Sequence, residues 1–109
     1  MTEDKGGMIE RLYAVIASRR NADAGTSYTA SLLAKGVDEV ARKMGEEAVE
    51  TMIAAAREDK AASIRESADL VYHLLVLWAR LGIAPEEVAN ELKKREGKSG
   101  IAEKKSRGN

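Results

Sequence analysis

The stretch AASIRESADLVYHLLVLWARL, residues 61–81, decides the fold of this chain. Between residues 70 and 79 nearly every position is apolar, so a helix formed here keeps no face for water. Such a helix lies at the centre of a bundle or in a subunit interface. A single chain of 109 residues is small for covering it on every side, and the stretch therefore predicts a homodimer.

Four other patterns also predict helices. Apolar residues from Ile9 to Ile16 recur three and four positions apart, the stripe of a helix with one buried face. Gly36 is expected to end a short helix in the left-handed conformation that glycine tolerates, and Gly82 to close the central helix. Pro85 suits the first turn of a last helix. The expected helices cover residues 8–20, 28–35, 37–57, 61–81 and 85–95, an all-α bundle of about five helices.

The composition bounds the class of protein. A chain of this length forms one domain, and 33% of its residues are charged. It has no cysteine, which excludes disulfides and thiolate metal ligands. Its start lacks the order of a signal peptide, and its longest apolar run is too short to span a bilayer. We therefore expect a cytoplasmic protein with no membrane partner.

Charge is unevenly distributed, although 18 basic and 18 acidic side chains balance. Seven Lys/Arg and two Asp/Glu lie from Lys93 onward, which leaves the preceding part acidic. An acidic domain argues against a nucleic-acid partner. We expect a flexible leader over residues 1–7, a helical domain over 8–96 and a disordered basic tail over 97–109.

Two pairs of carboxylates form the most informative pattern. Glu47 and Glu50 lie three positions apart on one expected helix. Glu66 and Asp69 have the same spacing on the next, so each pair shares a helix face. A short turn joins the two helices, and the pairs lie at similar distances from it along the chain. In an antiparallel hairpin they therefore come opposite each other.

These acids have two interpretations. Most glutamates are solvated, and Glu46 alone fits that description. For the four together a metal site is favoured, because converging carboxylates repel one another and Asp69 adjoins the most apolar part of the chain. A hard divalent cation relieves both problems, and Mg²⁺ keeps positions for water and substrate phosphates. The spacing predicts a magnesium site without indicating the reaction.

Several motifs resemble one enzyme family. Glu-Glu-x-x-Glu at 46–50 and Glu-x-x-Asp at 66–69 resemble the metal signature of the all-α, MazG-like nucleoside triphosphate pyrophosphohydrolases. From about residue 9 to 95 the chain resembles the phosphoribosyl-ATP pyrophosphatases within that superfamily. The narrower resemblance is carried by Ser-Tyr-Thr-Ala at 27–30 with Leu32, Leu33 and Gly36, by KMGEEAVE at 43–50, by Glu66 with ADLVYHLLVL at 68–77, and by Glu-Leu-x-x-Arg at 91–95.

The resemblance implies a MazG-like fold and magnesium-dependent hydrolysis of phosphoribosyl-ATP to phosphoribosyl-AMP and pyrophosphate, the second step of L-histidine biosynthesis. Glu46 is then a base for the attacking water, a ligand of a second metal ion, or a solvated neighbour. His73 is expected to be a core residue with one satisfied hydrogen bond, and Tyr72 and Trp78 to be packing groups. The expected magnesium ligands are Glu47, Glu50, Glu66 and Asp69, and the expected substrate contacts are Tyr28, Thr29, Lys43 and Arg95.

Two other functions remain open at this point. A related enzyme that hydrolyses a nucleotide such as dUTP or dCTP would have the same metal site and a different base pocket. A helical dimerisation module without catalysis would carry these acids as surface groups. Pyrophosphate release from each nucleotide distinguishes the three hypotheses.

Overall fold

The chain forms five α-helices and, within residues 7–20, 22–23, 25 and 27–97, no strand. These are the residues that the structure, a computed structural model, describes. The all-α fold class is confirmed, and the helices begin and end within a few residues of the expected limits. The expected leader and tail lie outside the described residues except for Gly7 and Gly97. The helices are α1 Met8–Ser18, α2 Tyr28–Leu33, α3 Val37–Ala56, α4 Lys60–Leu81 and α5 Pro85–Arg95.

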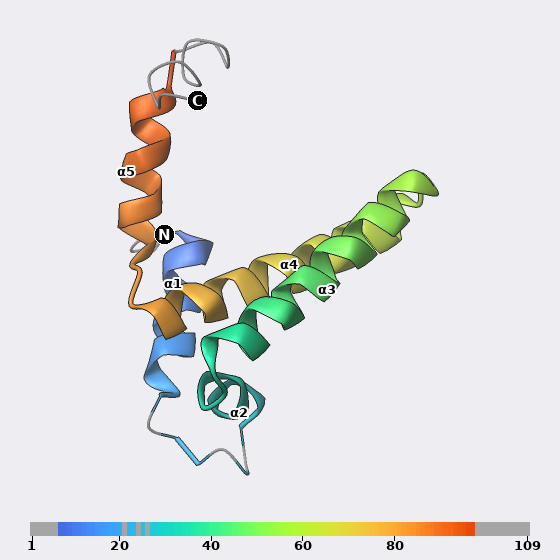
Figure 1. Cartoon of the computed structure of the whole chain (residues 1–109). Coiled ribbons are helices and arrows are strands. Elements are labelled where there is room, and N and C mark those ends of the chain that lie inside the picture. The colour runs from blue at the N-terminus through green and yellow to red at the C-terminus, as the bar shows by residue number, and fades with distance from the viewer. Residues whose placement is uncertain (1–6, 21, 24, 26, 98–109) are drawn as a thin grey trace, which may run out of the picture.

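The two longest helices, α3 and α4, lie side by side as an antiparallel hairpin (Figure 1). The hairpin turns where the sequence indicates a break. Glu58 takes a positive φ of 56°, and Asp59 begins α4 by accepting a hydrogen bond of 3.0 Å from the backbone N–H of Ala62. A side-chain cap of this kind satisfies one of the free N–H groups at a helix start. The turn therefore brings the two acid-bearing helices together.

The core lies near the other end of the hairpin, where α1 and α2 pack against it (Figure 1). Ile16 of α1 is fully buried, and Leu75 of α4 is 1% exposed. Burying one such side chain is worth about 1.5–3 kcal/mol, which fixes the ends of α1 and α2 on α4. The buried cluster consists of Ile16, Leu32, Val40, Leu75, Val76 and Ala79.

The two glycines expected at helix ends behave differently. Gly82 ends α4, as predicted, and it does so with a φ of 74° in the left-handed conformation. The prediction for Gly36 was wrong: α2 ends at Leu33, and Gly36 has a φ of −68° and precedes α3 as its N-cap. Three residues between the helices give the chain room to turn without a left-handed residue.

The fifth helix turns away from α4 by 109°, so α5 and the hairpin diverge (Figure 1). The exposed faces retain large apolar side chains, including Met52 at 65% and Ile64 at 61% exposure. Val71 is exposed and Trp78 is half-buried, so one chain does not cover α4 on every side. Within the described ranges no single helix is long and apolar enough to cross a membrane; α4 and α5 have the required length and composition only as a bent pair.

Candidate active site

Three carboxylates converge in the middle of the hairpin. One oxygen from each of Glu47, Glu66 and Asp69 lies within 4.8 Å of the other two. Glu47 on α3 is 7% exposed, and Glu66 on α4 is half-buried. The spacing of three residues brings the side chains of Glu66 and Asp69 to one face of α4, opposite α3. We call these three residues the acid cluster.

Two buried oxygens of the acid cluster lack hydrogen-bond donors. The Oε1 atoms of Glu47 and Glu66 are buried and have no hydrogen-bond partner among the described residues. A buried carboxylate oxygen without a donor is unfavourable, and carboxylates this close repel one another. A hard divalent cation would supply the missing positive charge, and the donor set is entirely oxygen. The acid cluster therefore fits a metal ion.

The fourth expected ligand, Glu50, lies beside the acid cluster rather than within it. Burial raises the pKa of Glu66, and the negative charge of the neighbouring Glu50 carboxylate raises that pKa further. Glu50 itself is exposed. Side chains three positions apart on a helix diverge by about 60° around its axis. This rotation allows Glu47 to be buried against α4 while Glu50 remains at the rim.

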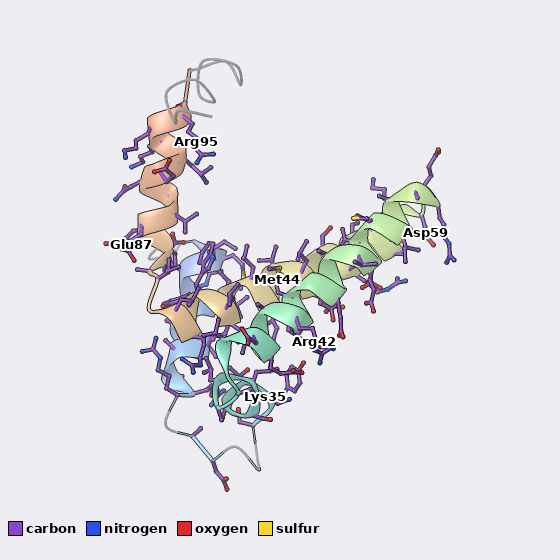
Figure 2. All side chains as sticks on the ribbon, viewed as in Figure 1. Lys35, Arg42, Met44, Asp59, Glu87 and Arg95 are labelled. Carbon is purple, nitrogen blue, oxygen red and sulfur yellow. The ribbon has the colours of Figure 1, made fainter. Side chains whose placement is uncertain are left out.

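A cavity of about 220 Å³, lined by three cationic side chains and by Glu39 and Glu46, lies between α2 and α3. Three of the residues that line it are Lys35, Arg42 and Lys43, and Figure 2 shows Lys35 and Arg42 on this side of the molecule. We call it the cationic pocket. Lys43 Nζ lies 3.7 Å from a carboxylate oxygen of Glu47, so the cationic pocket adjoins the acid cluster. Lys43 was predicted from the sequence, whereas Lys35 and Arg42 were not.

Glu46 is not one of the three converging carboxylates. Its carboxylate forms an ion pair with Arg42 one turn earlier on α3 and lies 3.6 Å from Lys43 Nζ. It lines the cationic pocket together with these two residues. The spacing of Arg42 and Glu46, four positions apart on one helix, is a sequence signal from which this pair could have been predicted.

Two hydroxyl groups at the start of α2 bond to α4. The Tyr28 hydroxyl lies 3.1 Å from Nε2 of His73. The Thr29 hydroxyl is hydrogen-bonded to the hydroxyl of Tyr72, so Tyr72 does more than pack. The Tyr28 side chain is 57% exposed and lines the cationic pocket. Four residues from two helices thus form a clamp, which we call the α2–α4 clamp: Tyr28, Thr29, Tyr72 and His73.

His73 is a buried residue with two hydrogen bonds rather than one. Its Nδ1 atom lies 2.8 Å from the backbone carbonyl of Asp69, and its ring is 7% exposed. The ring contacts Tyr28 and Tyr72 edge-on, with centroids 6.2 and 5.1 Å away. His73 therefore links the clamp to the helical turn that carries an acid-cluster residue.

Arg95 lies far from these groups within one chain. Figure 2 places it at the far end of α5, remote from Arg42 and Met44 on the hairpin. Its guanidinium is 3.1 Å from the carboxylate of Glu91, one turn earlier. A contact between Arg95 and the substrate of this acid cluster would require a second chain.

The family of the protein follows from comparison with known sequences. A family model described as phosphoribosyl-ATP pyrophosphohydrolase matches residues 9–96. The chain belongs to this family. The match includes the acid cluster, the cationic pocket and the α2–α4 clamp, and the family resemblance of the sequence motifs is confirmed.

Curated relatives agree with the phosphoribosyl-ATP pyrophosphohydrolase family. Phosphoribosyl-ATP pyrophosphatase of Azospirillum brasilense is 55% identical over 109 residues, which cover 98% of each chain. The protein of the same name from Parvibaculum lavamentivorans is 57% identical over 92% of each chain. That of Paramagnetospirillum magneticum is 56% identical, again over 92% of each chain.

Proposed function

We propose that the protein hydrolyses phosphoribosyl-ATP to phosphoribosyl-AMP and pyrophosphate, the second step of L-histidine biosynthesis. The observation that carries this proposal is the adjacency of the acid cluster and the cationic pocket, joined by Lys43 and Glu47 at 3.7 Å. A triphosphate needs both a metal site and cations. The close relatives bearing the name phosphoribosyl-ATP pyrophosphatase support this substrate.

The acid cluster is the proposed site of Mg²⁺, with Glu50 completing the set from the rim. When bound, Mg²⁺ neutralises charge on phosphate oxygens and makes a coordinated water more acidic. The chain contributes the position of the carboxylates: Glu47 comes from α3, and Glu66 and Asp69 from α4, so the hairpin itself sets their separation.

Lys43 is the proposed contact of the triphosphate. It lies between the cationic pocket and the acid cluster, where an ammonium group reaches phosphate oxygens on one side and Glu47 on the other. Glu46 keeps the three roles left open by its sequence position. Of these, a base for the attacking water requires release from Arg42, which binds the same carboxylate.

Tyr28, Thr29 and Arg95 are the remaining proposed substrate contacts. Tyr28 lines the cationic pocket and offers its exposed ring and oxygen to the substrate, while Thr29 is half-buried beside it. Arg95 would contact a phosphate from the second chain of a dimer, because its own hairpin lies far away (Figure 2). A guanidinium is suited to bind a phosphate through two parallel hydrogen bonds.

A homodimer is part of this proposal. The two hairpin helices carry a row of exposed apolar side chains that one chain leaves in water: Val49, Met52, Ile53, Ile64 and Val71. Exposed large apolar side chains gathered on two adjacent helices are typical of subunit interfaces. Light scattering coupled to gel filtration measures the mass in solution, and a mass of one chain would remove the dimer from the proposal.

Pyrophosphate release tests the function. The protein is incubated with Mg²⁺ and, separately, phosphoribosyl-ATP, dUTP and dCTP. We expect release from phosphoribosyl-ATP alone, lost on chelation by EDTA, and restored growth of a histidine-requiring strain that lacks this step. Release only from dUTP or dCTP would assign the related nucleotide hydrolase, and no release from any of them would favour the non-catalytic module.

A further inference from the structure

A second cavity, of about 340 Å³, lies where the ends of α1, α2 and α4 meet (Figure 1). Ligand-binding cavities in proteins measure about 300–1,000 Å³, so this one is large enough for a compact ligand. The residues assigned to the proposed reaction do not line it. Its described lining contains two cations, three apolar side chains and no carboxylate: Arg20, Leu33, Ala34, Ala79 and Arg80. We call it the arginine pocket.

Each arginine of this pocket is bonded to the backbone of a different element. The guanidinium of Arg20, just after α1, donates a hydrogen bond of 2.9 Å to the carbonyl oxygen of Ala79 on α4. The Nε–H group of Arg80 on α4 donates one of 3.0 Å to the carbonyl oxygen of Lys35, after α2. The two bonds fix both guanidinium groups at the edge of one cavity.

These bonds use only part of the capacity of the two side chains. Carbonyl groups at helix ends are often free, so capping of such a carbonyl accounts for one donor of each arginine. A guanidinium has five N–H donors, and a carbonyl carries no net charge to balance it. In the described part of the chain neither Arg20 nor Arg80 forms an ion pair with an acidic side chain. Two positive charges that line one pocket repel each other, and a bound anion relieves that repulsion.

The composition of the arginine pocket favours one class of anion, a phosphate monoester. Above its second pKa of about 6 a monoester carries nearly two negative charges, which balance two guanidinium groups. Guanidinium groups also bind phosphate oxygens through pairs of parallel hydrogen bonds. A carboxylate or a phosphate diester carries one charge and leaves one cation unbalanced. The apolar side chains leave room for the carbon skeleton of the ligand.

We propose that the arginine pocket is a second anion site, in which Arg20 and Arg80 together bind the phosphate group of a phosphate monoester. The monoester has two possible sources. One is the phosphoribosyl group of phosphoribosyl-ATP, and this source rests on the proposed function. Arg80 follows Asp69 by eleven positions on α4, which is three turns on the same side of the helix and about 16 Å along its axis. The other source is a separate phosphorylated compound.

Binding is measured first, without turnover, on metal-free protein at low salt. Ribose 5-phosphate is the probe, and ribose and acetate are the controls for the sugar and for a single negative charge. We expect saturable changes in the ¹H–¹⁵N signals of the Arg20 and Arg80 side chains and of the Ala34 amide. Ribose should leave these signals unchanged, and acetate should bind more weakly. The absence of a saturable change with ribose 5-phosphate at millimolar concentrations would overturn the proposal.

Substitutions test whether the two arginines hold the phosphate. Arg20→Gln and Arg80→Gln should each weaken binding of ribose 5-phosphate about tenfold or more, the effect of losing one hydrogen bond to a charged group. Arg20→Lys, which keeps the charge and loses the paired donors, should give a smaller loss. Arg19→Gln is the matched control, because Arg19 is the neighbouring exposed arginine and does not line the pocket. Equal weakening by Arg19→Gln, or parental affinity in both pocket variants, would contradict the proposal.

The cationic pocket also attracts phosphate, so Lys43→Met serves as a second control. It should leave the affinity reported by the Arg20 and Arg80 signals unchanged, since Lys43 does not line the arginine pocket. Loss of these changes in Lys43→Met would mean that the phosphate binds at the cationic pocket instead, and the proposal would fail.

Kinetics with phosphoribosyl-ATP and Mg²⁺ distinguish the two sources of the monoester. A KM raised about tenfold in Arg20→Gln and Arg80→Gln, with kcat within about twofold of the parent, assigns the phosphate of the substrate itself. Parental KM in both variants, with binding of ribose 5-phosphate weakened, assigns a separate phosphorylated compound. A parent protein that binds ribose 5-phosphate at this pocket without turnover overturns the proposed function alone. A parent with turnover and no such binding overturns the second anion site alone.

Discussion

The ammonium group of Lys43 lies 3.7 Å from the carboxylate of Glu47, one turn further along α3. This pair joins the acid cluster to the cationic pocket, in which three cations outnumber Glu39 and Glu46. A triphosphate substrate bound across the two sites would have its anionic phosphates between a divalent ion at the acid cluster and the cations of the pocket. Substitutions confined to one site or the other separate their contributions.

Loss of one carboxylate from the acid cluster should abolish turnover without unfolding the protein. For Glu47→Gln and Asp69→Asn we expect a loss of kcat on the order of 100-fold or more, as for other groups that organise transition-state charge. The metal-free variants should be no less stable than the parent, because one repelling charge has gone. Marked destabilisation in urea unfolding with EDTA would instead make these acids structural.

The metal-free protein should lose stability as the pH rises through the raised pKa of Glu66. Burial raises that pKa above the ordinary value of 4.5. The contribution of Glu66 to the free energy of unfolding is therefore fully present below about pH 4.5 and is lost at higher pH. Glu66→Gln removes this dependence. The variant should therefore gain free energy of unfolding relative to the parent as pH rises, measured by urea unfolding with EDTA; parallel curves would contradict this.

Removal of the Lys43 charge should weaken substrate binding more than folding. We expect Lys43→Met to lower kcat/KM about 10- to 100-fold, the range for hydrogen bonds to charged groups, mainly through KM. Lys94→Met is the control, because Lys94 is exposed on α5 and paired with Glu91 at 3.7 Å. Equal effects of the two substitutions would mean that only overall charge matters.

Two glycine substitutions should change stability in opposite directions. Gly82 has a φ of 74°, where alanine is strained, so Gly82→Ala should lower the free energy of unfolding by about 1–2 kcal/mol. Gly45 lies inside α3 with open space within 4 Å of the position that a Cβ would take, and Gly45→Ala should raise it by up to about 1 kcal/mol. Thermal or urea unfolding measures both. A stable Gly45→Ala protein with reduced activity would indicate that the substrate approaches the backbone there.

The helices and the acid cluster were predictable because both depend on local spacing. Apolar positions three and four apart set the helices, and the short turn at Asp59 fixed which faces of α3 and α4 meet. The convergence of Glu66 and Asp69 on Glu47 followed from those two facts. The position of Glu50 at the rim did not, because a shared face extends around part of the helix and only packing decides which member is buried.

The α2–α4 clamp could not be predicted from the sequence. Tyr28 and His73 are 45 positions apart, and Thr29 and Tyr72 are 43 apart, so no local pattern connects them. Their contact depends on the packing of α2 against α4. The position of Arg95 could not be predicted either, because it depends on the 109° change of direction between α4 and α5.

The apolar side chains on the outside of the hairpin have a consequence for how robust the protein is. Met52 and Ile64 remain mostly in water until another surface covers them. In the proposed homodimer folding is coupled to association, so the midpoint of thermal unfolding should rise with protein concentration. Dilute preparations would then be the first to unfold on heating or to be digested, although each chain keeps the same sequence.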